Sequence, residues 1–337
     1  MLRLFLQKGA YFSAHRIPGL RCAVQSERLD IFDLLVQQPS FDPHYQDLYQ
    51  QNALQYVSNA QTPSAAYQMA HRLVDHGVPI NVVGQGITPL AYLVVRVKYK
   101  PAMALLERGA DPYFDGHNQR MCTLGWCFND RFIDPSKPEL TKELREDRRK
   151  LVALFIAKGA DVNRVAITGD ERHTPLCWAL MEGKDVECIR ILLDAGASIT
   201  DAVTYANGSR TEGLLRMLFC RVAGFNPWVP REETPSEASF EPCKDSVHLL
   251  LENGARIDSV DDEVSALGIC CRMSTPEVGN WALEFLVDDS TRRNATPEFV
   301  EYIFEDTEDE AVRTLLGRLR DKSAGDGEHD EAETADE

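Results

Sequence analysis

The sequence has no apolar run long enough to cross a membrane, and its apolar opening, Met1–Leu6, is too short for the core of a secretory signal peptide. It also has no Gly-rich phosphate loop, no GxSxG motif, no HExxH motif and no paired carboxylates in an apolar setting. These absences exclude the enzyme classes that depend on such motifs, and they leave no residue to nominate as catalytic. We therefore expect a protein without enzymatic activity, cofactor or membrane contact.

Basic residues are in the minority, because 36 Lys and Arg stand against 53 Asp and Glu, for a net charge of −17. The last fifteen residues, Ser323–Glu337, carry seven acids and no Lys or Arg, so the rest of the chain still has a charge of −10. No basic patch is present that could displace the counterions of nucleic-acid phosphates, and nucleic-acid binding is disfavoured. A protein with a basic surface is the more natural partner.

A zinc-type pattern of cysteines is also absent. Cys122 and Cys127 are separated by four residues near His117, which is not a CxxC spacing, and no second Cys/His pair follows at zinc-site distance. We expect both thiols to pack in the core and predict no metal. The odd total of nine cysteines indicates reduced thiols in the cytoplasm or nucleus. Predicted core positions hold several others, namely Cys22, Cys177, Cys188 and Cys270.

The stretch Thr174–Asp201 predicts two short helices that end in a tight turn. Thr174 can cap a helix whose first position is Pro175, where the missing N–H costs nothing. Gly183 ends this helix, Asp185 caps the next, and Gly196 ends that one in turn. Apolar residues at helical spacing give the second helix one apolar stripe. Two helices this short cannot bury their apolar faces alone, so the pattern calls for similar neighbours.

Similar neighbours are present along the chain. The ending of two apolar residues, two polar residues, Gly and a small residue recurs at Gly9, Gly77, Gly109, Gly159, Gly196 and Gly254. Thr-Pro starts precede such endings at Thr88 and Thr174. A period near 33 residues with TPL at the start and GAD at the end resembles the ankyrin repeat, over about residues 1–318. The resemblance implies an all-α ankyrin-repeat solenoid of about eight to ten degenerate helix-turn-helix repeats.

The same resemblance implies where a partner would bind. Ankyrin arrays generally bind proteins with their loop tips and the concave rim of their inner helices. Matching positions here are Gln85, Ile87, Val95, Arg96, Gln119, Arg120, Glu171, His173, Met181 and Glu182. We expect His173 to be an exposed loop residue. The family usually has His at the end of the TPLH tetrapeptide, where this chain has Ala91 and Cys177, so we expect a less regular and less stable array.

The array is expected to span residues 1–320, followed by an acidic disordered tail at 321–337. Irregular insertions fall near 129–149 and 225–244, the second rich in Pro, Glu and Ser and predicted to be a surface loop. A capping pattern at Ser136–Glu139, with no Gly or Pro until Gly159, predicts one extended helix near 138–158. Its early charged residues are expected to protrude into solvent: Lys142, Glu143, Arg145, Glu146 and Arg148.

Three functional hypotheses follow. The first is a monomeric, non-catalytic scaffold that binds a protein partner through its concave face and loop tips. The second is a substrate-recognition adaptor fragment of a ubiquitin ligase, suggested because Met1 begins within a repeat, as if an N-terminal module were missing. The third, from another class, is an enzyme or metal protein that uses Cys122, Cys127 and His117.

Overall fold

The computed structural model contains two compact units, which we call the N-terminal unit (Met1–Ile167) and the C-terminal unit (Thr168–Glu337). Each is described by itself. The residues that the structure describes are 18–84, 86–113, 122–128, 138–168, 171–182, 185–199, 203–205, 211–218, 243–257, 296–306 and 310–325.

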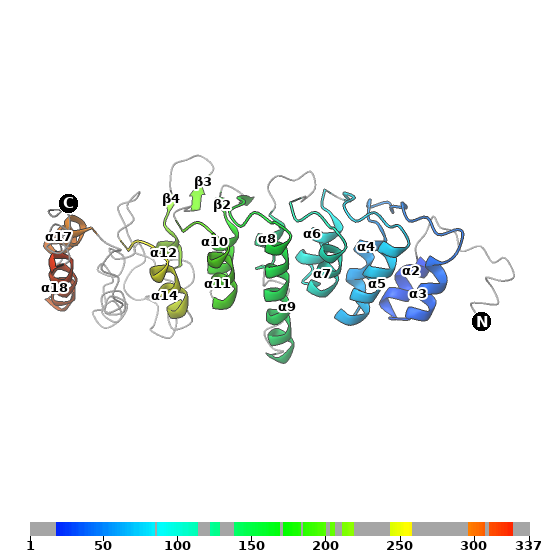
Figure 1. The fold of residues 1–337 in the computed structure, drawn as a ribbon, viewed down its shortest axis with the longest axis horizontal. Coiled ribbons are helices and arrows are strands. Elements are labelled where there is room, and N and C mark those ends of the chain that lie inside the picture. Colours follow the sequence, from blue (N-terminus) through cyan, green and yellow to red (C-terminus); the bar gives the residue numbers. More distant parts are fainter. Residues whose placement is uncertain are drawn as a thin grey trace, which may run out of the picture. The chain divides into compact units, whose positions relative to one another are not determined.

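Helices of the N-terminal unit lie in two layers (Figure 1). The inner layer contains α2 (Pro18–Gln25), α4 (Ala53–Tyr56) with the 3-10 turn η1 (Val57–Asn59), α6 (Pro89–Val95) and α8 (Thr123–Trp126). The outer layer contains α3 (Leu29–Val36), α5 (Pro63–Asp75), α7 (Tyr99–Glu107) and α9 (Pro138–Ala157). Within each layer every helix contacts the next, so α2, α4, α6 and α8 form one series and α3, α5, α7 and α9 the other. This is the predicted stacking of helix pairs.

The C-terminal unit continues the helical pattern. Its described helices are α10 (Pro175–Glu182), α11 (Val186–Asp194), α12 (Leu214–Met217), α14 (Lys244–Glu252), α17 (Pro297–Asp306) and α18 (Glu310–Gly325). Helix α10 contacts α11 and α12, α11 contacts α14, and α17 packs on α18. The all-α class is confirmed, although short strands, which the sequence did not predict, occupy the loops.

These strands belong to loops that precede or follow the helix pairs. In the C-terminal unit, β2 (Glu171–His173) pairs antiparallel with β3 (Val203–Tyr205), with Glu171 opposite Tyr205, and β3 pairs with β4 (Thr211–Glu212). A further strand, β1, comprises Ala166–Thr168 at the border of the two units. Because β2 leads into α10 and β3 follows α11, the pairing joins the loops on either side of one helix pair.

The Thr-Pro starts work as predicted. The Oγ1 atoms of Thr62, Thr88 and Thr174 accept the backbone N–H three residues on, at 3.4, 3.2 and 3.3 Å, and the following Pro occupies the first helical turn. The helix-ending glycines that the structure describes all have a positive φ, which L side chains rarely adopt: Gly77, Gly109, Gly159, Gly196 and Gly254. The Thr caps and the glycines with positive φ therefore set where the helices begin and end.

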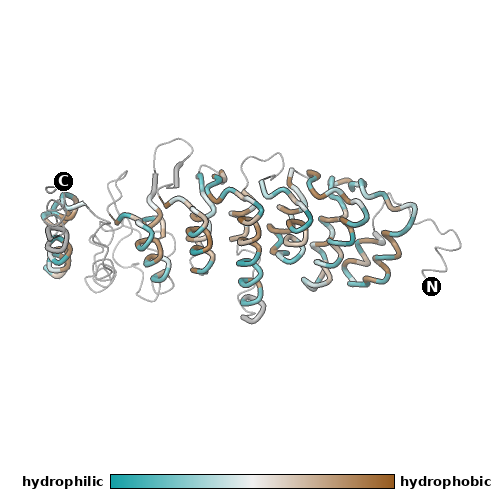
Figure 2. Tube along the Cα trace, in the orientation of Figure 1, coloured by the Kyte–Doolittle hydropathy of each residue, from teal (hydrophilic) through white to brown (hydrophobic). Residues whose placement is uncertain are grey.

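The core lies between the paired helices and between neighbouring pairs. Figure 2 shows hydrophobic and hydrophilic stretches side by side within the helices of both units. Large side chains that are almost completely buried include Phe32, Leu54, Met69, Leu73, Leu90 and Phe155. Burial of such a side chain stabilises the fold by about 1.5–3 kcal/mol, and each repeat obtains that burial from its neighbours.

The extended helix is confirmed as α9, and in Figure 1 it reaches further than the helices beside it in the N-terminal unit. Its predicted solvation is wrong for Arg148, whose exposed fraction is 2%. The reason is that α9 packs along α7, and this contact buries one face of the helix despite its charges. Lys142, Glu143 and Glu146 are exposed as predicted, while Arg145 is half-buried.

The structure also bears on the predicted burial of Cys22 and on the search for membrane-spanning helices. Cys22 is exposed rather than buried, because it lies on the open side of α2 while Ala23 and Val24 face the core. Most of the 225–244 insertion, Gly9, Cys270 and residues 326–337 lie outside the described residues, and the boundaries at 320 and 321 stay predictions. Among the described helices none is both long and apolar enough to cross a membrane.

Candidate protein-binding surface

Helix α6 leaves one side uncovered. Leu90, Leu93 and Val94 are buried, because α6 contacts α4 and α8 within the inner layer and α7 in the outer layer. The remaining side holds Tyr92 and Val95, which are half-buried, and Arg96, which is exposed at the end of the helix. These three residues, which we call the α6 face, are the accessible part of this inner helix.

The side chains of Tyr92 and Arg96 are held together. The Arg96 Nη2 atom donates a hydrogen bond to the Tyr92 hydroxyl at 3.2 Å, and the Arg96 Cζ lies 5.4 Å from the centre of the Tyr92 ring. A cation over an aromatic ring contributes about 0.5–1 kcal/mol at an exposed site. Within the described part of the chain no carboxylate pairs with Arg96, and its guanidinium presents several N–H donors at the exposed end of α6.

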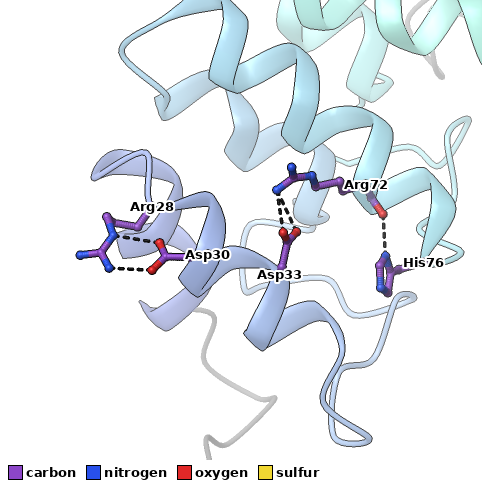
Figure 3. A network of polar contacts seen from close by, with 5 residues as sticks. All are labelled: Arg28, Asp30, Asp33, Arg72 and His76. Atoms are coloured by element: carbon purple, nitrogen blue, oxygen red, sulfur yellow. Dashed lines mark hydrogen bonds and ion pairs between the residues drawn. The ribbon is translucent and has the colours of Figure 1, made fainter. Parts of the chain in front are cut away.

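The outer layer differs, because its charges compensate one another (Figure 3). The Arg72 Nη1 on α5 donates to both carboxylate oxygens of Asp33 on α3, each at 2.9 Å. Beside them, Arg28 binds Asp30 through two bonds of 2.9 and 2.7 Å, and this pairing lowers the pKa of Asp30 to about 2. The Arg72 carbonyl accepts a hydrogen bond from His76 Nδ1 at 2.8 Å. The Arg72–Asp33 pair therefore joins α5 to α3, while the exposed Arg28–Asp30 pair lies at the start of α3 alone.

Three of the binding residues predicted for the N-terminal unit lie at the two ends of α6. Ile87 is half-buried in a tight turn before α6, where its N–H and C=O bond the C=O and N–H of Gly84 at 3.2 and 2.9 Å. Ile87, Val95 and Arg96 therefore flank one helix, at its entrance and its exit. Gln85, Gln119 and Arg120 lie outside the described residues.

In the C-terminal unit the prediction for His173 is wrong. Its exposed fraction is 2%, and its ring lies edge-on against Trp178, with 5.3 Å between the ring centres. The residue is buried because β2 delivers it directly against α10, rather than leaving it in an open loop. Met181 on α10 is half-buried and accessible. Glu171 and Glu182 lie on β2 and α10, but the structure does not describe their side chains.

Sequence reasoning missed the exposed apolar residues of the loops. In the N-terminal unit the described large apolar side chains with the highest exposure lie in loops between an outer helix and the next inner helix or strand. They are Leu48 at 99%, Tyr49 at 66%, Tyr113 at 47% and Val165 at 45%. The available signal was an adjacent Leu-Tyr pair in the polar segment Gln46–Gln51, which has no helical or strand periodicity to explain it.

The candidate metal ligands do not form a described site. Cys122 and Cys127 are buried, with exposed fractions of 2% and 0%, and the Cys127 Sγ lies 3.6 Å from the carbonyl oxygen of Thr123. The predicted packing of both thiols in the core is confirmed. His117 lies outside the described residues, and among those described no three His, Cys, Asp or Glu side chains gather as metal ligands would.

Charge is divided unequally between the two units. Residues 1–167 carry 20 Lys and Arg against 16 Asp and Glu, whereas residues 168–337 carry 16 against 37. The acidity of the whole chain therefore belongs to the C-terminal unit, and the N-terminal unit is slightly basic. An argument about partners from the net charge of the chain applies to one unit only.

Comparisons with known proteins place one repeat in a family. Residues 171–205, which contain β2, α10, α11 and β3, match the family model described as Ankyrin repeat. No curated protein matches the chain. Solved structures with a similar fold include the ankyrin repeat domain of Bcl-3, a member of the IkappaB family, at 18% identity and a TM-score of 0.48, covering 74% of this chain and 92% of that domain.

Two further structures show comparable similarity. An ankyrin repeat domain from Acinetobacter baumannii has 19% identity and a TM-score of 0.48, covering 70% of this chain and 98% of its own. A chain from the complex of the predatory endopeptidase Bd0816 of Bdellovibrio bacteriovorus with the immunity protein Bd3460 gives 18% identity and a TM-score of 0.44, covering 60% of this chain and 90% of the matched chain.

Proposed function

Because residues 171–205 match the Ankyrin repeat model and helix pairs stack in the same way elsewhere in the chain, we propose that the protein is a non-catalytic scaffold that binds a protein partner through its inner helices and loop tips. The partner contacts proposed from the sequence are, in the N-terminal unit, Gln85, Ile87, Val95, Arg96, Gln119 and Arg120, and, in the C-terminal unit, Glu171, Met181 and Glu182. His173 is withdrawn from this set because it is buried.

The observation that carries the proposal is the α6 face. Tyr92 and Arg96 are preset by their own contact, and the half-buried Val95 adds apolar surface next to them. Tyr and Arg are the residue types that most often dominate the binding energy of protein interfaces, because each combines apolar area with directed hydrogen bonds. A side-chain pair already held in one geometry loses little entropy when a partner binds.

Charge supports different partners for the two units. The α6 face belongs to the slightly basic N-terminal unit and suits a carboxylate or aromatic group on the partner. The basic partner surface proposed from the sequence suits the C-terminal unit, with its excess of Asp and Glu.

Recovery of partners from a lysate tests the assigned face. Full-length protein carrying Arg96→Ala together with Tyr92→Ala should recover its principal partner at less than about one third of the wild-type yield, since two contacts of about 1 kcal/mol or more are removed. The matched control is Arg28→Ala, which removes an exposed arginine whose side chain is 57% accessible and paired with Asp30. Equal recovery by all three proteins would eliminate the α6 face, and the same comparison with Met181→Ala tests the C-terminal unit.

Oligomeric state and location are proposed as well. We expect a monomer of 37.9 kDa in the cytoplasm or nucleus, without a bound cofactor. Light scattering coupled to size-exclusion chromatography measures the mass, and a species of twice that mass would contradict the proposal.

A further inference from the structure

We propose that Leu48 and Tyr49 form a preset apolar anchor that inserts into an apolar pocket with a basic rim on a protein partner. The inference rests on the proposed function and adds to it a contact outside the α6 face. It concerns the loop between α3 and α4, which we call the anchor loop (residues 42–51).

The anchor is the most exposed apolar feature of the described chain. Leu48 is 99% exposed and the adjacent Tyr49 is 66% exposed. A single exposed apolar side chain is ordinary. Two large adjacent ones at the tip of one turn form an apolar area that no other part of the described chain covers. Burial in a partner would recover about 1.5–3 kcal/mol for a Leu side chain, relative to leaving it exposed.

The turn that presents the anchor is fixed by Asp47. Its Oδ1 accepts the backbone N–H of Tyr49 and of Gln51, both at 2.8 Å. Its backbone N–H donates to the Gln51 carbonyl at 3.0 Å, and its carbonyl accepts from the N–H of Gln50 at 2.9 Å. Gln50 takes a φ of 58°, a conformation that the surrounding bonds hold in place. The tip therefore has one geometry, although its side chains are in solvent.

Contacts with the body of the unit support the same turn. The Tyr56 hydroxyl on α4 donates to Asp47 Oδ2 at 2.5 Å, so that both carboxylate oxygens are used. Burial and this bond raise the pKa of Tyr56 further above neutral pH. The neighbouring loop packs so closely that a Cβ on Gly84 would meet the Gln50 carbonyl oxygen at under 3.0 Å. The Gln46 Nε2 also donates to the Val83 carbonyl at 3.4 Å.

Rigidity is what turns an exposed apolar pair into an anchor. A flexible loop would lose conformational entropy on binding, which costs about 0.5–1.5 kcal/mol for each ordered side chain, and a fixed turn avoids much of that loss for its backbone. Tyr in particular supplies a large rigid area with a hydroxyl that can bond the partner.

The charge of the anchor loop indicates which kind of partner surface would bind it. The loop contains Asp42, Asp47 and one His and no Lys or Arg, so its own residues carry a net negative charge, while Arg21 on α2 acts on Tyr56 behind the tip. A projecting pair of side chains fits a concave apolar pocket, and the nearby negative charge favours Lys or Arg at the rim of that pocket. An anionic lipid surface would repel the same loop, so the observations favour a protein over a membrane.

Site-specific crosslinking tests the anchor in the full-length chain. The photoreactive amino acid p-benzoylphenylalanine replaces Leu48 in one protein and Arg28, an exposed residue of the same unit, in the control. After irradiation in the expressing cells, mass spectrometry identifies the crosslinked residue on any partner. We expect an adduct from position 48 and not from position 28, attached beside an apolar pocket bordered by Lys or Arg.

Affinity for that purified partner, measured by calorimetry, completes the test. Leu48→Ser with Tyr49→Ser should weaken binding at least about tenfold, and Tyr56→Phe, which loosens the turn and leaves both anchor side chains in place, about threefold. Tyr302→Ser, which changes a 58% exposed aromatic in the C-terminal unit, should leave affinity unchanged. Unchanged thermal unfolding of the Leu48 and Tyr49 variant shows that folding is intact.

Three outcomes would contradict the inference. Position 48 could crosslink to a second copy of this chain or to no protein at all, or the protein could sediment with vesicles of phosphatidylcholine and phosphatidylserine in a way that depends on Leu48. If the partner's affinity is lost with the Tyr92 and Arg96 variant but kept with the Leu48 and Tyr49 variant, the anchor is wrong and the proposed function stands. If neither variant changes any protein contact, the proposed function fails as well.

Discussion

At the scale of residues, Gly84 lies where two loops of the N-terminal unit pack backbone against backbone. A Cβ added there would lie under 3.0 Å from the Gln50 carbonyl oxygen, which is backbone and cannot rotate away. The same residue forms two backbone hydrogen bonds with Ile87. The absence of a side chain at this position therefore allows the anchor loop to rest on the loop that follows α5.

Replacing Gly84 by Ala should destabilise the chain. The added methyl group forces the two loops apart, and such overpacking costs about 1–3 kcal/mol. Urea unfolding followed by circular dichroism should show a lower transition midpoint for Gly84→Ala.

The matched control is Gly19→Ala. A Cβ at Gly19 would meet Leu35 Cδ1 at 3.7 Å, an ordinary contact, and Ala is favoured over Gly in a helix by roughly 0.5–1 kcal/mol. This variant should be neutral or slightly more stable. Equal midpoints for the two variants would mean that the loops separate without cost.

At the scale of elements, α9 is connected to α7 by charge as well as by packing. The Lys100 Nζ on α7 lies 2.7 Å from Glu143 Oε1 and 3.5 Å from Asp147 Oδ2, both on α9. Asp147 is buried, with an exposed fraction of 4%, and burial raises its pKa despite the nearby ammonium group. The hydrogen bond with Lys100 lowers the pKa of the exposed Glu143. The ammonium group of Lys100 thus stabilises the charged form of the buried Asp147 carboxylate.

Replacing Lys100 by Met should reduce stability in a pH-dependent way. At pH 7 the variant would hold an ionised Asp147 without its partner, and the free energy of unfolding should fall by about 2 kcal/mol, less than for a fully buried pair because Lys100 is partly exposed. Since the pKa of Asp147 is raised in the folded state, protonation relieves this penalty as the pH falls towards that pKa. Urea unfolding at pH 7 and near pH 4.5 should give a larger loss at the higher pH.

Lys142→Met provides the comparison on the same helix. Lys142 is exposed on α9, and its replacement should change the free energy of unfolding by no more than about 0.5 kcal/mol at either pH. A loss for Lys100→Met that is independent of pH would show that packing of its alkyl chain, and not the charge of Asp147, explains the effect.

Local patterns predict the helices well, because their ends depend on neighbouring residues alone. Thr88 and Thr174 cap helices that begin at the following Pro, and Gly109 and Gly196 end helices in the left-handed conformation. Helix α9 is likewise predicted from a start signal and the absence of any stop. The pairing of β2 with β3 is not predictable in this way, because it joins residues more than thirty positions apart, as with Glu171 and Tyr205.

The burial of individual side chains and the residues of the candidate surface are harder to predict from the sequence than the helices. Arg148 and His173 are polar, and nothing in their immediate neighbours indicates that α7 or Trp178 will cover them. Cys22 is exposed although its residue type is usually buried. Leu48 looks like a core residue by type, and only the bonds of Asp47 in three dimensions show that it is held in solvent. Each of these outcomes depends on contacts between segments rather than on a periodic pattern.

At the scale of the whole molecule, the division of charge sets the response to salt. The C-terminal unit has 37 Asp and Glu against 16 Lys and Arg, so its acidic groups repel one another, whereas the N-terminal unit is close to balanced. Salt weakens such repulsion by screening, with a Debye length that falls from about 30 Å at 0.01 M to about 10 Å at 0.1 M.

Hydrogen exchange of the full-length protein should therefore respond to salt in one unit only. Raising the salt from about 0.01 M to about 0.1 M should slow exchange about twofold or more in peptides from α10, α11 and α14, because the folded form is relieved of self-repulsion. Peptides from α5 and α7 serve as the internal control and should change little. Equal slowing in both sets would show that net charge is not what limits the stability of the C-terminal unit.

The unequal charge also provides reagents that report the charge of the surface that a partner uses. A polycation such as polylysine should compete with any molecule held by the acidic C-terminal unit and with a basic rim beside the anchor loop, whereas a polyanion such as heparin should compete at basic groups of the N-terminal unit such as Arg96. Adding each polymer in turn to a complex would show the charge of the contacted surface without any substitution in the chain. A partner displaced by heparin would be an acidic ligand of the first 167 residues, whereas one displaced by polylysine would be a basic ligand of the C-terminal unit or of the anchor loop.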